Sequence, residues 1–150
     1  EKVADYIFKE SLERCMITPS SVMIKRDFFL ETGGFNESLP ACEDYDLWLR
    51  LCHRYPVHFV DEALIVKYGG HADQLSRKYP AMDRFRVRAL DRLLTTQALG
   101  ENDFEAARDT LVDKLDILLK GARKHANQAL IDEFEPLARR WRDTPRVAAC

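Results

Sequence analysis

The chain has 150 residues, of which 46% are hydrophobic, a size that suits one well-packed core better than two. Its 23 basic and 25 acidic residues nearly cancel, so the charge argues against a protein that binds nucleic acid or an anionic membrane. No apolar stretch approaches the roughly 20 residues that cross a bilayer, and no transmembrane segment is expected. Four cysteines without CxxC spacing predict reduced thiols. We therefore expect a cytoplasmic protein, free or peripheral to the inner membrane face.

The first half of the sequence predicts short helices mixed with short strands. Apolar residues at helical spacing open the chain, and Thr18-Pro19-Ser20 ends the helix that they predict. Gly33-Gly34 ends a second helical turn, with one glycine in a left-handed cap. A third helix follows Pro40. Helices are expected over residues 3–15, 26–32 and 42–54, and β-branched runs predict strands over residues 21–25, 57–60 and 64–68.

The second half of the sequence changes character after residue 77. Apolar residues recur there every three or four positions, which gives each segment a single buried stripe. The expected fold class is therefore α/β with few strands over residues 1–77, followed by an all-α extension over residues 78–150, and helix-dominated overall. The extension suits a structural or interaction role better than catalysis. Its helices are expected over residues 80–97, 103–124 and 127–142.

Three carboxylates lie together at the start of the helix expected over residues 42–54. Glu43, Asp44 and Asp46 occupy its first turn, where the positive end of the helix dipole favours anions. Apolar side chains take up most of the remaining circumference, so this helix is expected to be buried with its acids at the edge of the core. An ionised carboxylate held there can accept a proton from a hydroxyl group. The same acids would also stabilise the helix start, and the residues alone leave both interpretations open.

Several segments in order resemble a known enzyme family. They are residues 20–26, residues 28–37 with the Gly-Gly-Phe turn, residues 43–50 with the Glu-Asp pair, and a stretch that ends at His71. Together they resemble the second half of the catalytic domain of a family 2 glycosyltransferase of the GT-A fold, which makes residues 1–77 the C-terminal part of such a domain. The resemblance implies inverting transfer of a sugar from a nucleotide-sugar donor to a glycan or other hydroxyl acceptor.

The resemblance also implies roles for the acids and the glycines. Asp44 matches the general base that takes the proton of the acceptor hydroxyl, and Glu43 becomes an acid that orients the substrate behind it. Gly33 and Gly34 would let the backbone approach the donor sugar, where a Cβ would collide. The alternative for both glycines is a plain helix cap, which is compatible with that role.

Four further residues carry weaker implications. Trp48 is a candidate sugar platform, although its spacing fits the core better. Arg50 either faces the donor diphosphate or makes a structural ion pair. His71 is a candidate contact to a metal or to the diphosphate, and Arg77 is a candidate contact to phosphate or acceptor.

The resemblance covers residues 15–77 and omits the nucleotide-binding half of the family's domain. That half would carry the Asp-x-Asp motif, which holds Mg²⁺ or Mn²⁺ against the donor diphosphate in a full-length enzyme. The start at Glu1 rather than Met fits a fragment, and this chain alone is expected to be inactive and to bind no metal. Apolar surface left by the missing half would favour self-association. The alternative is a noncatalytic helical interaction module that retains a degenerate transferase segment.

Overall fold

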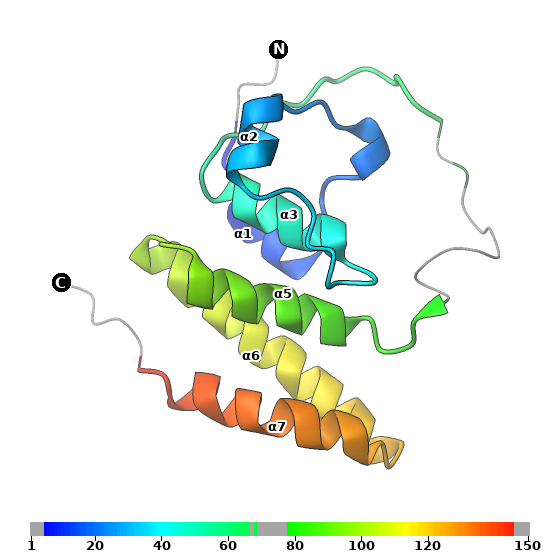
Figure 1. Cartoon of the computed structure of the whole chain (residues 1–150), viewed down its shortest axis with the longest axis vertical. Helices are drawn as coiled ribbons and strands as arrows, with labels where there is room; N and C mark the ends of the chain where they lie inside the picture. The colour runs from blue at the N-terminus through cyan, green and yellow to red at the C-terminus, as the bar shows by residue number, and fades with distance from the viewer. Residues whose placement is uncertain (1–4, 67, 69–77, 146–150) are drawn as a thin grey trace. The chain divides into compact units, whose positions relative to one another are not determined.

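The computed structural model describes residues 5–66, 68 and 78–145. The chain divides into two compact units, Glu1–Met82 and Asp83–Cys150. Figure 1 shows short helices and long connections in the first unit and three longer helices in the second. Helices dominate the described residues, and each unit buries apolar side chains of its own.

The N-terminal unit is built around helix α3, Glu43–Cys52, against which helix α1, Phe8–Glu13, packs. Every residue of α3 from Tyr45 to Cys52 is buried, so the helix lies inside the unit as the sequence predicted. The Tyr45 hydroxyl donates a hydrogen bond to the Leu12 carbonyl and ties the two helices together. The buried apolar side chains of this unit include Phe8, Leu12, Tyr45, Leu47, Trp48 and Leu49.

The strands predicted over residues 21–25, 57–60 and 64–68 are wrong for the part of the chain that the structure describes. The β-pairing there is a single antiparallel bridge between Asp5 and Val57. A β-branched run needs a neighbouring strand to satisfy its backbone, and no second pairing forms for these runs among the described residues. Their apolar side chains stay exposed instead, including Met23, Phe59, Val60, Leu64, Ile65 and Val66.

Helix α1 is shorter than the predicted helix over residues 3–15. Asp5 exchanges two backbone hydrogen bonds with Val57, at 3.1 and 2.9 Å, which holds its backbone extended and delays the helix start to Phe8. Arg14 is extended as well, and the helix ends before it. A pairing partner distant in sequence therefore overrode the local helical pattern.

The predicted glycine cap is confirmed after helix α2, Arg26–Glu31. Gly33 has φ +79° and Gly34 has φ +64°, so both glycines adopt the left-handed region that disfavours other residues. Their amides donate to the carbonyls of Leu30 and Phe29, at 2.9 and 3.0 Å, and satisfy the end of α2. A short 3₁₀ turn, Pro19–Ser21, precedes α2.

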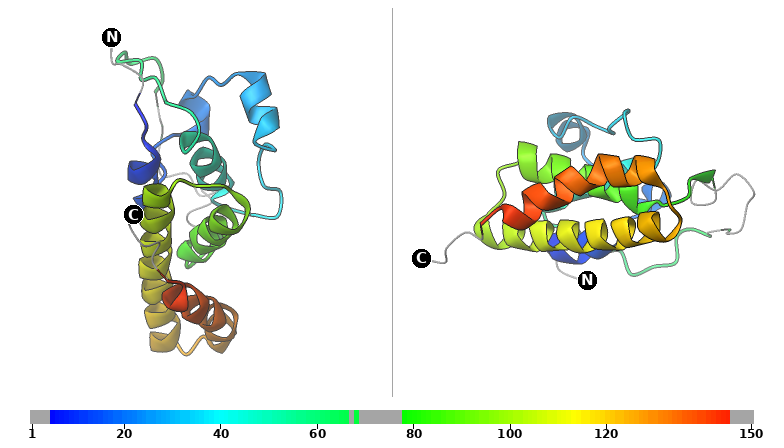
Figure 2. Two further views of the ribbon diagram at one scale, coloured as in Figure 1. Left: turned by 90° about the vertical axis from the view of Figure 1, so that its left-hand side faces the viewer. Right: turned by 90° about the horizontal axis from the view of Figure 1, so that it is seen from below.

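The C-terminal unit consists of helices α5, Asp83–Thr96, α6, Glu101–Lys124, and α7, Gln128–Asp143. These bounds lie within a few residues of the helices predicted from the sequence. Helix α6 packs against both others, and α7 folds back along it (Figure 2). The unit has its own core. None of the helices in the described part of the chain is long and apolar enough to cross a membrane. The buried apolar side chains of this unit include Phe85, Leu90, Leu93, Leu111, Leu115, Leu119, Phe134 and Trp141.

Candidate active site

The three acids at the start of α3 have different environments. Asp46 is 2% exposed and pairs with Arg50 one helical turn later, with 2.6 Å between Asp46 Oδ2 and Arg50 Nη2. Glu43 and Asp44 are partly exposed. Because Asp46 is enclosed and neutralised by a cation, it has no access to a substrate proton. The first turn therefore offers two accessible carboxylates.

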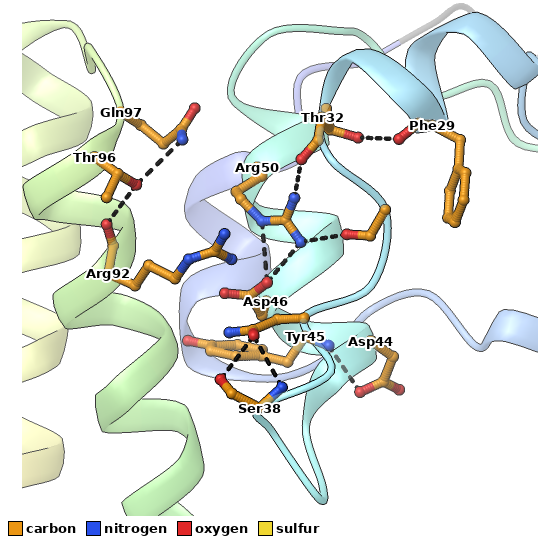
Figure 3. A network of polar contacts seen from close by, with 12 residues as sticks. Phe29, Thr32, Ser38, Asp44, Tyr45, Asp46, Arg50, Arg92, Thr96 and Gln97 are labelled. Atoms are coloured by element: carbon orange, nitrogen blue, oxygen red, sulfur yellow. Dashed lines mark hydrogen bonds and ion pairs between the residues drawn. The ribbon is translucent and has the colours of Figure 1, made fainter.

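Arg50 takes the structural alternative that the sequence left open. The residue is 2% exposed, and its guanidinium also donates to the carbonyls of Thr32 and Gly34, the latter at 2.7 Å. Figure 3 shows these bonds together with the bond to Asp46. The guanidinium thus joins α3 to the glycine turn, and its described contacts are to protein groups.

Asp44 is held by contacts at both of its carboxylate oxygens. Oδ1 accepts a 2.7 Å hydrogen bond from the Tyr45 amide, and Oδ2 lies 3.5 Å from the Cys15 Sγ. The carboxylate points away from the Asp46–Arg50 pair (Figure 3). A carboxylate has about four acceptor positions, so two contacts leave room for a further donor such as a hydroxyl group. Among the described residues Glu43 has no comparable contact.

Cys15 is the thiol that faces Asp44. Burial, the charge of Asp44 and the hydrogen bond to Asp44 together raise the pKa of Cys15 from 9.0 to about 12, and burial is the largest of these causes. The thiol therefore stays protonated near neutral pH and can donate its proton to Asp44 or to the Ile17 carbonyl, 3.2 Å away. A protonated thiol is a poor nucleophile, so this cysteine has no sign of a covalent role.

The backbone just before α3 is strained. Cys42 occupies the N-cap with φ +62°, in the left-handed region, and it is buried. A non-glycine residue in this conformation costs on the order of 1 kcal/mol or more and persists where its surroundings fix it. The entry of the chain into the acidic turn is thus set by packing rather than by local preference.

The other candidates of the N-terminal unit lie in the core or in the glycine turn. Trp48 is 4% exposed and belongs to the core, and its indole Nε1 is buried without an acceptor among the described residues. No described atom lies within 4 Å of a Cβ built on Gly33, so the space over this residue is open. A Cβ on Gly34 would lie 3.2 Å from the Phe29 ring. The open space at Gly33 is compatible with close approach of a ligand.

His71 and Arg77 lie outside the described residues. Within the part of the chain that the structure describes, no three His, Cys, Asp or Glu side chains gather closely enough to hold a metal ion. The described residues therefore contain no preformed metal site with three protein ligands.

The sequence matches the family described as "Glycosyltransferase like family 2" over residues 5–96, which is more than half of the chain. The chain belongs to this family. The match runs from before α1 to the end of α5, further than the resemblance over residues 15–77. Helix α5, which the sequence suggested was part of an extension, thus lies inside the matched region.

Relatives support the same assignment over a shorter stretch. An uncharacterised glycosyltransferase of Rickettsia felis is 42% identical over 67 residues, which make up 45% of this chain and 11% of that relative. One of Rickettsia conorii is 40% identical over 67 residues with the same shares. An uncharacterised protein of Mycobacterium tuberculosis is 34% identical over 73 residues, 46% of this chain and 23% of that protein. The chain thus spans about a tenth of the Rickettsia relatives, and no solved structure matches it significantly.

The contact between Cys15 and Asp44 was missed in the sequence, and no partner was named for the ion pair that was offered as one alternative for Arg50. Cys15 lies 29 residues before Asp44, and nothing in the local sequence signals their contact. The Asp46–Arg50 pair was visible, because oppositely charged residues four apart on a helix face one another. That spacing, on a helix expected to be buried, was enough to predict a structural ion pair.

Proposed function

We propose that the protein containing this chain transfers a sugar from a nucleotide-sugar donor to an acceptor hydroxyl with inversion, and that Asp44 is the general base. Family membership supports a glycosyltransferase. The GT-A fold, the inverting course and the role of Asp44 are parts of the proposal.

The environment of Asp44 is the observation that carries the choice of base. Asp46 is buried against Arg50, and Glu43 is not held by another described residue, whereas both oxygens of Asp44 have a fixed contact. A sugar hydroxyl becomes a strong nucleophile only as its proton is removed. A carboxylate at a fixed position and with free acceptor capacity removes that proton at least entropic cost.

In this proposal the Gly33-Gly34 turn lies beside the donor sugar, whereas the nucleotide and any divalent cation are bound outside the described residues. Within those residues no metal-ligand cluster occurs, and the groove of about 610 Å³ in the described part of the C-terminal unit is lined by α6, α7 and the residues that follow α7. The 150-residue chain by itself is accordingly proposed to be inactive. Activity has to be tested in the natural protein that contains it.

Replacing each of the two accessible acids by its amide tests the proposal. Asp44→Asn and Glu43→Gln are compared in that natural protein, with UDP-, GDP- and dTDP-sugars as donors and simple glycosides as acceptors. Loss of a positioned base is expected to lower turnover about 10²- to 10⁴-fold in Asp44→Asn, with a smaller loss in Glu43→Gln. Retained turnover in Asp44→Asn removes this residue from the role of base. No turnover of any donor by the unaltered protein favours the noncatalytic interaction module instead.

A further inference from the structure

Arg50 connects the two parts of the candidate site. Its guanidinium lies between the glycine turn that follows α2 and the helix that carries Asp44, and it is almost completely buried. The acidic turn and the glycine turn are the two sequence features that the proposed function uses. The residue that joins them has no role assigned by that function.

Hydrogen bonds to protein groups use most of the N–H donors of Arg50. An arginine has five N–H donors in a planar fork, and here Nε and Nη2 both bind Asp46 Oδ2, at 3.0 and 2.6 Å. Nη2 also reaches the Gly34 carbonyl, and Nη1 reaches the Thr32 carbonyl. The two carbonyls lie on either side of Gly33. One rigid group therefore holds the turn at two points.

The glycine turn is consequently fixed from both sides. The amides of Gly33 and Gly34 are bound by α2, and the carbonyls of Thr32 and Gly34 are bound by Arg50 of α3. Two glycines with positive φ form a flexible segment, and a segment of this kind keeps one geometry only where its surroundings determine it. The bonds from α2 alone leave the position of the turn relative to α3 unspecified.

We propose that Arg50 is a positioning residue for sugar transfer, which fixes the Gly33-Gly34 turn relative to Asp44. Asp44 and Arg50 are six residues apart on one buried helix, a rise of about 9 Å, so whatever is fixed to Arg50 is fixed to Asp44. Asp46 holds the guanidinium in the required orientation. This inference rests on the proposed function, since it concerns the spacing between the base and a turn beside the donor.

Arg50→Lys and Arg50→Met test this role, because they remove the fork to different extents. Lysine keeps the charge opposite Asp46 but is a compact cation that cannot hold two carbonyls and a carboxylate in one plane. Methionine removes every bond. Misplacement by about 1 Å can cost about 10²-fold in rate. Turnover in the natural protein is expected to fall about 10-fold in Arg50→Lys and about 100-fold in Arg50→Met. Arg50→Lys is expected to be the more stable of the two variants, because its charge still faces Asp46.

Phe8→Ala is the matched control. Phe8 is a 3% exposed core residue of α1 whose ring packs against His53, and its loss destabilises the same unit without altering a bond to the turn. All variants are assayed at a temperature at which circular dichroism shows them folded. Phe8→Ala is then expected to keep kcat within about twofold, because catalytic geometry is unchanged in the folded fraction.

Hydrogen exchange in the 150-residue chain gives a second readout that does not depend on activity. Amides in the peptide over residues 28–37 are expected to exchange faster in Arg50→Met, while those in α1 keep their wild-type protection relative to global unfolding. If folded Arg50→Met keeps kcat within about twofold, or loses no more than Phe8→Ala, the positioning role is refuted. The outcome for Asp44→Asn distinguishes this failure from failure of the proposed base. If Asp44→Asn loses sugar transfer while the Arg50 variants keep it, only the positioning role of Arg50 is refuted.

Discussion

Replacing Asp44 by Asn is expected to make the Cys15 thiol more reactive. The charge of Asp44 and its hydrogen bond are two of the causes that raise the pKa of Cys15 to about 12, and burial is the largest. Asparagine has nearly the same shape but no charge, so it removes the repulsion between a carboxylate and a thiolate. Burial continues to act, and the pKa of Cys15 should fall part of the way toward 9.0.

The size of the effect is bounded by the thiolate populations. At pH 8 a thiol of pKa about 12 is ionised to about 10⁻⁴, whereas one of pKa 9.0 is ionised to about 10⁻¹, so the rise in thiolate lies below about a thousandfold. Since burial is the largest cause and persists, we expect about a tenfold rise. Loss of intrinsic nucleophilicity at the lower pKa offsets part of this gain.

Alkylation of the 150-residue chain with iodoacetamide at pH 8 measures this effect, with peptide mapping by mass spectrometry to separate the cysteines. Cys52 is an internal control, because burial raises its pKa to about 11 and Asp44 is not among the causes. The Cys15 rate should rise in Asp44→Asn, and the Cys52 rate should stay constant. An unchanged Cys15 rate, or an equal rise at both thiols, would refute the contact between Cys15 and Asp44.

The remaining predictions concern stability and association. The pKa of Cys52 is raised by folding, so its contribution to stability is intact below pH 9 and is lost as pH rises toward 11; the loss of stability between pH 8 and pH 10 in urea unfolding should therefore be about 1.4 kcal/mol smaller in Cys52→Ser than in the unaltered chain. Gly34→Ala should cost about 1–2 kcal/mol in urea unfolding because of its positive φ and the nearby Phe29 ring, and an unchanged midpoint would contradict that turn. The exposed apolar side chains over residues 59–66 should make the 150-residue chain self-associate, and a monomer in sedimentation at about 100 μM would contradict this.

The helices were predictable because their signal is local. In α6 and α7 the apolar residues recur at helical spacing, and the structure places these helices within two residues of the expected bounds. The burial of α3 and the cap at Gly33-Gly34 followed from equally local patterns. Each of these predictions depended on residues only a few positions apart.

The failures involve contacts between distant residues. The β-branched run over residues 57–60 has the composition of a strand, but a strand forms only when a neighbouring strand pairs with it. Among the described residues, Val57 is the one residue of this run with a β-bridge, and its partner is Asp5. Cys15 lies just after the end of α1 and Asp44 lies on α3, so no periodicity in the sequence predicts their contact. The bonds from Arg50 to the glycine turn likewise depend on how α2 and α3 meet.

The central claim is that Asp44 takes the proton of the acceptor hydroxyl. The most direct measurement is kcat of Asp44→Asn relative to the unaltered natural protein, at saturating donor and acceptor, with circular dichroism to confirm folding of both. The account predicts a loss of at least about 100-fold with little change in KM for the donor. A folded Asp44→Asn protein that turns over within about threefold of the unaltered protein would contradict the account.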